Sequence, residues 1–419
     1  MSRTGASFAF ETVSDAEIFN ICAGMVRAAR RSEIDQSLFM ARNILLYATL
    51  KWPSAARYAG GFAAAGCTVY ALSPDGAPVQ SSRYVSGSHI YSPLAPLRSL
   101  RKAIARAAPD LIVPCDDRAV RHLLRLYHAE QGSAVAALVA RSIGQPENYE
   151  RVLSRSESLA ALRKMGVRVP DTLPVTSEVQ LDDCLAVTGL PAVLKADESW
   201  GGEGVVIANT PEEAHAAYRK LSSPPSRLRS VARTAKRRDL HFLLAALKPA
   251  ATSVCVQRFV EGQPAASAFA ANEGGVVGAL YYDVLVTHGA IGPPSVIRRV
   301  DCPEMAAATR AAAECFGLSG IHGLDFIRDA SGAVHLIEIN PRTTQGGTLP
   351  FGTGRDLPSA LASTLTTGPV GMRRAIDKEI VVFFPREWKH NPASPYLKTG
   401  HHDVPWDDPA VMDAALGAA

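Results

Sequence analysis

The sequence lacks the features of a secreted, membrane-spanning or nucleic-acid-binding chain. Its first residues contain no apolar run like that of a signal peptide, and no window reaches 18 unbroken apolar residues. The net charge of +4 is small and dispersed, which argues against a nucleic-acid partner. A hydrophobic content of 47% with 20% charged residues is typical of a globular protein, so we expect a soluble cytoplasmic chain with no membrane partner.

Several cysteine and glycine motifs are absent as well. The seven cysteines are scattered and form no CxxC pair, so we expect buried free thiols in a reducing compartment and no zinc site. No GxGxxG follows the first predicted strand, which disfavours a dinucleotide-binding Rossmann domain. The phosphate-binding GxxxxGK[ST] motif is also missing.

The stretch GLDFIRDASGAVHLIEINPR, residues 323–342, is the most informative part of the chain. It predicts two strands joined by the turn DASG, whose residues are common turn formers. A four-residue loop would pair Arg328 with Ala333 and place Asp325 opposite Leu336.

On this register, three oxygen-bearing side chains would project from one face of the hairpin, because side chains alternate along a strand. They are Asp325, Glu338 and Asn340. Two carboxylates and a carboxamide oxygen suit a hard cation, Mg²⁺ or Mn²⁺. Arg342 follows the strand and could fork onto a phosphate or a carboxylate. Taken alone, the stretch is equally compatible with an exposed hairpin that has a polar face.

The N-terminal third predicts a parallel, doubly wound sheet after a leader, residues 1–40, that contains a helix beginning at Ser14. The predicted strands are residues 43–49, 67–72 and 110–117, and the predicted helices are residues 53–66, 96–108 and 119–130. Asp116 and Asp117 close the last strand, at the end where open α/β sheets place ligands. Either could hold a substrate amine or simply cap the next helix.

The middle of the chain begins with a predicted helix that Gly166 stops, and it then combines a lysine with a glycine-rich loop. Lys195 lies in a short buried strand, and burial of a lysine is costly unless it meets a counter-charge. The loop SWGGEG, residues 199–204, allows close approach of backbone N–H groups to an anion. The pair predicts a triphosphate clamp, with a surface lysine beside a turn as the alternative. The basic segment 224–248 is either a solvated helix or a lid that offers arginines to an anionic substrate or acidic partner.

The C-terminal half predicts further strands and a substrate loop. VQRFV is expected to connect two strands within residues 253–271. Arg298 and Arg299 end a later strand, and by alternation only one of them could reach a phosphate. After Arg342, the sequence TTQGG at 343–347 could cradle a substrate.

Taken in order, these pieces resemble the ATP-grasp superfamily over about residues 42–380. The resemblance implies ATP and magnesium as ligands, with the ion held by Asp325, Glu338 and Asn340, and catalytic roles for Arg342, Lys195 and Arg299. The other implied nucleotide contacts are Arg155, the flap residues Ser199, Gly201, Gly202 and Gly204, and the hinge residues Gln257, Arg258, Phe259, Val260 and Glu261. Pro264 stands where the family often has an acidic ribose contact, and Glu261 is the candidate replacement.

The expected fold class is α/β and α+β: a doubly wound pre-ATP-grasp domain followed by a two-subdomain ATP-grasp fold. The expected boundaries are a leader at 1–40, a pre-ATP-grasp domain at 41–147, an ATP-grasp domain at 148–365, and a C-terminal strand and extended tail at 366–419. Within the ATP-grasp domain we expect a linker at 148–175, a flap-bearing subdomain at 176–250 and a metal-binding subdomain at 251–365.

The implied function is an ATP- and Mg²⁺-dependent ligase that converts a carboxylate to an acyl phosphate and joins it to an amine or another nucleophile. Its partners would be a small-molecule carboxylate and amine, and a homodimer is one possible assembly. One alternative is a nucleotide-binding module without catalysis. The other is a carboxylase that uses bicarbonate.

Overall fold

The computed structural model describes residues 42–197, 204–223, 253–287 and 292–417, together with positions 234 and 289. Three predicted features therefore lie outside the described residues: the leader at 1–40, the flap residues Ser199, Gly201 and Gly202, and the basic segment apart from position 234. In the described ranges, no helix is both long and apolar enough to cross a membrane.

The N-terminal sheet has four parallel strands in the order β3-β2-β1-β4. They are β1 (Arg42–Tyr47), β2 (Cys67–Ser73), β3 (Val85–Ile90) and β4 (Leu111–Pro114). Helix α2 (Ser54–Ala64) packs on one face, and α3 (Pro96–Ala107), α4 (Asp117–Ala129) and α5 (Ala134–Ile143) pack on the other. The predicted doubly wound sheet is confirmed, with β3 and α5 added. Strand β3 has no buried run in its sequence because it is an edge strand.

Between this sheet and the next lie η2 (Pro146–Asn148), α6 (Tyr149–Leu153) and α7 (Arg155–Lys164). The sequence predicted one continuous helix here, and that prediction is wrong. The chain breaks at Ser154, whose extended backbone ends α6 and whose hydroxyl accepts a hydrogen bond from the Glu157 N–H at 3.4 Å. Ser154 is thus the N-cap of a new helix, a position that serine favours.

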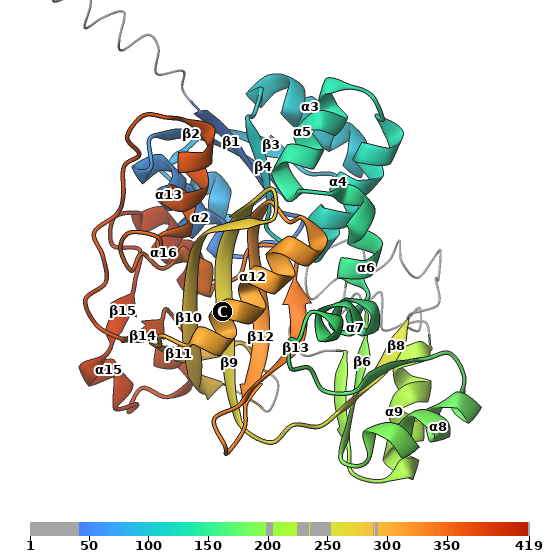
Figure 1. Cartoon of the computed structure of the whole chain (residues 1–419). Coiled ribbons are helices and arrows are strands. Elements are labelled where there is room, and N and C mark those ends of the chain that lie inside the picture. Colours follow the sequence, from blue (N-terminus) through green and yellow to red (C-terminus); the bar gives the residue numbers. More distant parts are fainter. Residues whose placement is uncertain are drawn as a thin grey trace, which may run out of the picture. The chain divides into compact units, whose positions relative to one another are not determined.

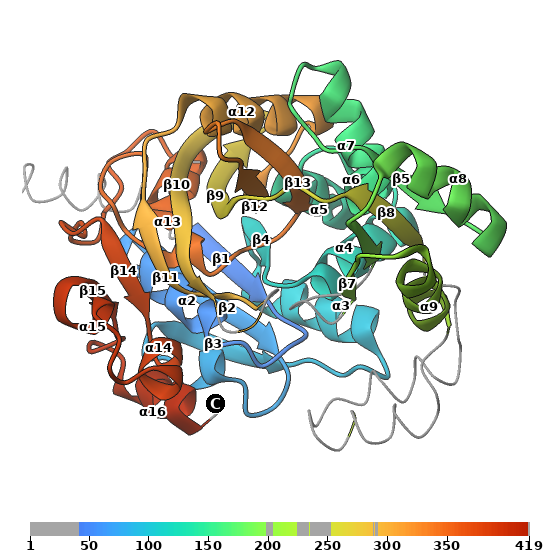
Figure 2. The same ribbon diagram turned by 90° about the horizontal axis from the view of Figure 1, so that it is seen from below.

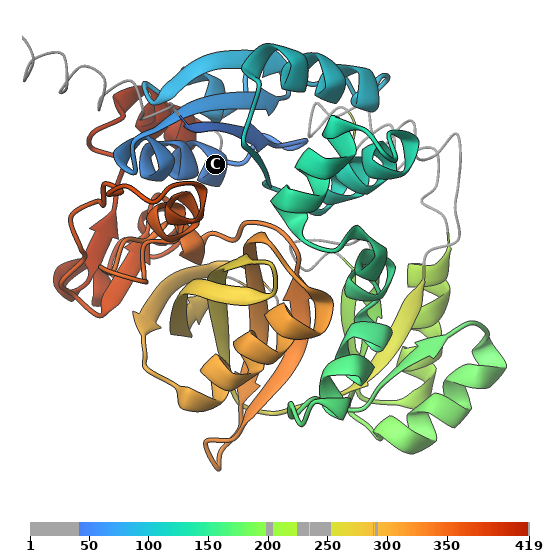
Figure 3. The ribbon, with the colours of Figure 1, turned by 45° about the horizontal axis from the view of Figure 1, so that its top comes forward.

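The described residues between 172 and 258 form a separate lobe (Figure 3, in green with its last strand in yellow). Its antiparallel sheet has the order β5-β8-β6-β7. The strands are β5 (Thr172–Val175), β6 (Ala192–Ala196), β7 (Val205–Ala208) and β8 (Val254–Arg258), and the helices are α8 (Glu178–Thr188) and α9 (Pro211–Ser222). The predicted β6–β7 hairpin around the glycine-rich loop is confirmed.

A seven-stranded sheet follows, in the order β13-β12-β9-β10-β11-β14-β15 (Figures 1 and 2). Its strands are β9 (Gln263–Asn272), β10 (Gly275–Thr287), β11 (Pro294–Arg299), β12 (Gly320–Arg328), β13 (Val334–Asn340), β14 (Ile380–Phe383) and β15 (His401–Asp403). Helix α12 (Pro303–Phe316) packs on one face, and α2 and α13 (Leu357–Ala362) pack on the other. The short elements are η1 (Pro78–Ser81), η3 (Gly346–Thr348), η4 (Ser363–Leu365), α14 (Arg386–His390), α15 (Tyr396–Thr399) and α16 (Pro409–Gly417).

Two apolar clusters join the N-terminal sheet to the seven-stranded sheet. One combines Tyr47 and Leu123 with Phe269 and other residues around α12, and the second places Phe62 of α2 against Ala268 and its neighbours. The predicted boundary at residues 147/148 therefore does not separate two cores. We call residues 42–164 together with 259–417 the body. The core of the lobe contains residues of the lobe alone.

Candidate functional site

The candidate site begins at a β-bulge in the β12–β13 hairpin. Arg328 pairs with Val334, so the predicted register is wrong, because the connecting loop has five residues. A register shift then leaves Ile337 without a partner and sets Asp325 directly opposite Glu338. A bulge inserts one residue and so reverses the alternation of side chains.

The reversal has a visible consequence for the residues of β13. Before the bulge, Leu336 is buried in the cluster beneath α12. After the bulge, Glu338 and Asn340 lie opposite Asp325 and Gly323, on the face that carries the loop after Arg342. The three predicted metal ligands thus share a face as expected, although Leu336 does not share it with them.

Hydrogen bonds connect the hairpin side chains into one network. Asn340 Nδ2 donates to Asp325 Oδ2 at 2.9 Å, and Arg342 Nη2 donates to Asn340 Oδ1 at 3.0 Å. Arg155, the first residue of α7, donates from Nη2 to Glu338 Oε1 at 2.8 Å. Both carboxylates therefore lie within a single set of charged and amide groups.

Two cations join this network to the lobe. Arg155 Nη1 donates to Asp197 Oδ1 at 3.0 Å and to the carbonyl of Ala196 at 2.7 Å. Lys195 is buried in β6, and its Nζ donates to the carbonyl of Ile337 at 3.3 Å. The strand that carries Lys195 thus lies against the bulge itself. Asp197 was not singled out in the sequence, where its only signal was its place two residues after Lys195.

The electrostatics differ between the two carboxylates. Burial raises the pKa of Asp325 to about 6, with the charge of Glu338 acting in the same direction. Burial also opposes the charge of Glu338, but Arg155 and Lys195 outweigh it and hold the pKa of that group below its ordinary value. Burial lowers the pKa of Lys195.

This arrangement fits a divalent cation. Two acidic side chains face each other across a strand pair, and the proximity of their charges is one cause of the raised pKa of Asp325. A cation that bridged them would remove that repulsion, and their oxygen atoms are the donors that Mg²⁺ prefers. In the described part of the chain, no group of three or more His, Cys, Asp or Glu side chains is placed to hold a metal ion. The two carboxylates would therefore need the carboxamide oxygen of Asn340 as a third protein ligand.

Arg342 connects the hairpin to the N-terminal sheet. Its Nε donates to Asp117 Oδ2 at 3.1 Å, and its guanidinium lies 5.7 Å from the centre of the Trp52 ring. Asp117 follows β4 and Trp52 follows β1, and the strand order reverses between these two strands. Ligands of open α/β sheets bind at such a reversal.

Of the two aspartates predicted there, Asp116 caps α4 and Asp117 pairs with Arg342. Asp116 accepts hydrogen bonds from the N–H and hydroxyl of Thr49 and from the N–H of Ala119, at 2.6, 2.8 and 2.9 Å. All of these partners belong to the protein. The capping alternative therefore describes Asp116.

The predicted hinge connects β8 to β9, which lie in different sheets. Gln257 belongs to β8, and its buried Nε2 donates to Thr172 Oγ1 at 2.9 Å and to the carbonyl of Ile337 at 3.3 Å. Arg258 turns outward and pairs with Asp171 at 2.8 Å. The connection itself is residues 259–262, shorter than the predicted VQRFV hinge, and includes Phe259, Val260 and the exposed Glu261.

Two further predicted residues lie apart from the network. Gly204 accepts a hydrogen bond from the N–H of Ala196 at 2.8 Å and begins the return into β7. Across the sheet, Asp325 pairs with Ala266, Ala266 with Tyr282, and Tyr282 with Arg299. Arg299 therefore lies in the same row of residues as Asp325. Its guanidinium is 3.6 Å from both Asp301 and Glu379. Arg298 lies on the other face, where it pairs with Asp283 at 3.5 Å.

The loop after Arg342 is packed closely against the site face. A side chain at Gly346 would meet the ring of Tyr282, and one at Gly347 would meet the hydroxyl of Tyr58. Tyr58 donates to the carbonyl of Thr344 at 2.7 Å, while the hydroxyl of Thr344 itself is buried without a partner. Because these two glycines have no side chain, the loop backbone can lie close to the rings of Tyr282 and Tyr58.

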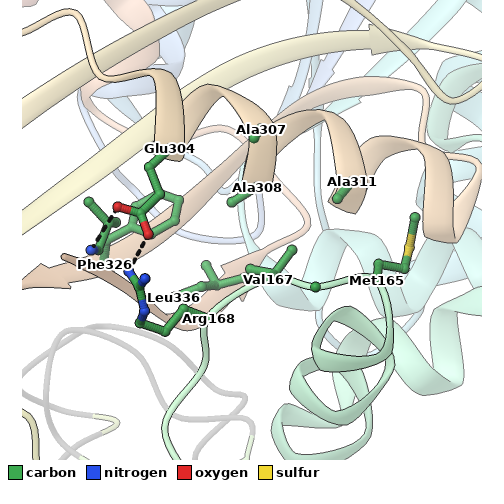
Figure 4. A pocket seen from close by; sticks show the side chains of 11 residues that line it. Met165, Val167, Arg168, Glu304, Ala307, Ala308, Ala311, Phe326 and Leu336 are labelled. Carbon is green, nitrogen blue, oxygen red and sulfur yellow. Dashed lines mark hydrogen bonds and ion pairs between the residues drawn. The ribbon is translucent and has the colours of Figure 1, made fainter.

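A cavity of about 150 Å³ lies on the opposite side of the hairpin (Figure 4). Phe326 and Leu336 line it, together with alanines of α12, and an ion pair between Arg168 and Glu304 lies at one end. Its volume is below the 300–1,000 Å³ that is usual for ligand pockets. It is separate from the face that carries Asp325 and Glu338.

Comparison with known proteins points to a known domain in the part of the chain that carries this network. The family model for the ATP-grasp domain matches residues 154–346. An N5-carboxyaminoimidazole ribonucleotide synthetase in complex with ADP superimposes with a TM-score of 0.56 at 15% identity, covering 80% of this chain and 79% of that chain. A biotin carboxylase–β-γ-ATP complex from Campylobacter jejuni gives 0.57 at 13% identity, covering 80% and 74%.

Among curated proteins, the carbamoyl phosphate synthase large chain of Pyrobaculum aerophilum is 24% identical over 156 residues. That match covers 37% of this chain and 15% of the length of the relative. The family model spans α7, the lobe, the hairpin and Arg342, which are the elements that build the network described above. Residues 154–346 of this chain are therefore an ATP-grasp domain.

Proposed function

We propose that the protein is an ATP- and Mg²⁺-dependent ligase that activates a small-molecule carboxylate as an acyl phosphate and transfers the acyl group to an amine. In the first step a carboxylate oxygen attacks the γ-phosphorus of ATP, and the bond to ADP breaks. In the second step the amine nitrogen attacks the acyl carbon, the carbon–oxygen bond breaks, and phosphate leaves. The amine loses one proton.

The network residues have distinct roles in this proposal. Asp325, Glu338 and Asn340 would hold magnesium, which would neutralise charge on the phosphate oxygens. Arg342 would follow the charge of the transferred phosphoryl group, and Lys195 would contact the phosphates from the lobe. Arg155 would hold Glu338 ionised and oriented.

The observation that carries the proposal is the direct opposition of Asp325 and Glu338 within reach of three cations. The test is ADP release by the purified protein with ATP, Mg²⁺ and a panel of acids and amines. We expect acid-dependent ADP release by the wild type and none by Glu338→Ala. Equal rates for the two proteins would exclude the proposal, and Mg²⁺-dependent ATP binding without turnover would favour the non-catalytic alternative.

A second candidate is a carboxylase that activates bicarbonate. It is favoured by the structural likeness to a biotin carboxylase and to a carboxyaminoimidazole ribonucleotide synthetase. In that case bicarbonate alone would stimulate ADP release. A reaction that proceeds equally well in bicarbonate-free buffer would exclude this candidate.

A further inference from the structure

Arg386 is a half-buried arginine that has no carboxylate partner among the residues that the structure describes. It is the first residue of α14, directly after β14, and lies in the C-terminal part of the chain beyond the ATP-grasp domain. Arg155, Arg328, Arg342 and Arg373 are also withdrawn from water, and each of them pairs with an Asp or Glu. No acidic side chain in the described ranges lies within ion-pair distance of Arg386.

The guanidinium uses only one of its nitrogens within the protein. Nη1 donates to the carbonyl of Pro294 at 2.5 Å and to Oε1 of Gln345 at 3.2 Å. Nε and Nη2, which form the edge that takes a carboxylate in two parallel hydrogen bonds, have no acceptor in the described part of the chain. The neighbouring Glu387 accepts from Ser295 instead.

A cation placed in this way is costly unless something compensates it. Burial lowers the pKa of Arg386, and no acidic group of the described ranges raises it again. A structural arginine would gain stability from a carboxylate partner, as the paired arginines do. Nε and Nη2 are not among the buried atoms that lack a partner, so this edge of the guanidinium is open to solvent and accessible to an anion that arrives from outside the chain.

Arg386 belongs to the surroundings of the candidate site. Gln345 lies three residues after Arg342, and the next residue, Gly346, packs against Tyr282. Tyr282 and Asp325 are two strands apart, about 10 Å at ordinary strand spacing. A small molecule that reacts beside Asp325 could therefore reach toward Arg386 with its other end.

We propose that Arg386 and Gln345 form a carboxylate-binding subsite, and that the substrate of this enzyme carries a second carboxylate in addition to the one that reacts. This inference rests on the proposed ligase function. Oε1 of Gln345 is held by Arg386, which leaves the amide nitrogen of Gln345 as a third donor beside Nε and Nη2. The substrate class is thus a dicarboxylate, which includes an acidic amino acid, because an arginine fork takes a carboxylate in two parallel hydrogen bonds.

The test measures binding directly, by calorimetry on the full chain without nucleotide. The probes are succinate, glutarate, butyrate as a monocarboxylate, and inorganic phosphate. We expect the wild type to bind a dicarboxylate more tightly than butyrate, and Arg386→Gln to lose at least about tenfold in that affinity. Arg374→Gln is the matched control, because Arg374 is an exposed arginine of the same C-terminal region and should leave binding unchanged.

A second variant keeps the test valid if Arg386→Gln fails to fold. Gln345→Glu would place a carboxylate against Arg386, so it should raise the melting temperature while it weakens dicarboxylate binding. No dicarboxylate binding by the wild type, tighter binding of phosphate than of succinate, or unchanged binding in both variants would overturn the subsite. Because no ATP is present, these outcomes are independent of whether the protein turns over ATP.

Discussion

The lobe and the body are held together internally by apolar cores, but they are joined to each other by polar contacts. The body shares two clusters between its sheets, whereas the lobe has a core of its own. The contacts that cross between them include those of Lys195 and Gln257 with Ile337 and those of Arg155 with Asp197. Such contacts can be exchanged for water or for a ligand at much lower cost than an apolar core, so the lobe can respond to what binds beside it.

The largest expected effect is on turnover and comes from a residue of the body alone. Arg342→Ala should reduce kcat by on the order of 10³-fold, by analogy with other phosphoryl-transfer arginines. Arg342→Lys, which keeps the charge but not the fork, should recover part of the loss. Both are measured as ADP release, with the circular dichroism spectrum as the check on folding. A decrease smaller than tenfold would remove Arg342 from the chemistry.

The next largest effect should be a loss of local stability where the lobe contacts the body. Arg155→Met removes the cation between Glu338 and Asp197, and loss of one partner of a buried pair costs about 3 kcal/mol. We expect amide hydrogen exchange to accelerate in β6 and β8 more than in β9 and β10. Uniform acceleration throughout the chain would mean that lobe and body unfold as a single unit. Asp197→Asn in the same background should add little, because the partner is already lost.

A pH-dependent effect of intermediate size is expected at Asp325. Its raised pKa, about 6, means that a proton must leave before the group can hold magnesium, so Mg²⁺ affinity should fall about fivefold between pH 6 and 5. In the metal-free protein the sign is opposite. There the folded state retains a proton that the unfolded state has lost, so this group's contribution to stability falls as the pH rises from about 4 to 6. Asp325→Asn should flatten both profiles, which calorimetry and thermal denaturation would show.

The smallest expected effect is a difference in nucleotide binding between variants of two adjacent residues at the end of β8. Gln257→Leu removes one hydrogen bond from the lobe to Ile337, and we expect a loss of about 1 kcal/mol in nucleotide binding. Arg258→Gln is the control, because the Arg258–Asp171 pair is exposed and such pairs contribute less than about 1 kcal/mol. Equal losses in both variants would mean that the contact with Ile337 has no special role.

Much of the fold was predictable because its signals are local. Buried strands such as β1 and β6, and the turn residues between β12 and β13, are visible in the sequence. The edge strand β3 was missed because it has no buried run of its own, and the break at Ser154 was missed because it does not strongly interrupt the apolar pattern of the helix.

The candidate site was predictable in its residue types and not in its connections. Asp325 on one strand, with Glu338 and Asn340 two apart on the next, predicts a metal site. The pairing of Arg342 with Asp117, however, joins residues 225 positions apart. Nothing local marks such a contact. Arg386 shows the same limit, because only the three-dimensional structure reveals that no carboxylate of the described residues pairs with it.

The bulge at Ile337 gives this edge strand two properties through one additional residue. It turns Glu338 toward Asp325, and the peptide carbonyl of Ile337 accepts from Lys195 and Gln257 of the lobe. Orientation of the acidic pair and attachment of the lobe are therefore encoded by the same peptide unit. A one-residue deletion there would disturb both at once, whereas a side-chain substitution at Ile337 would leave the carbonyl in place.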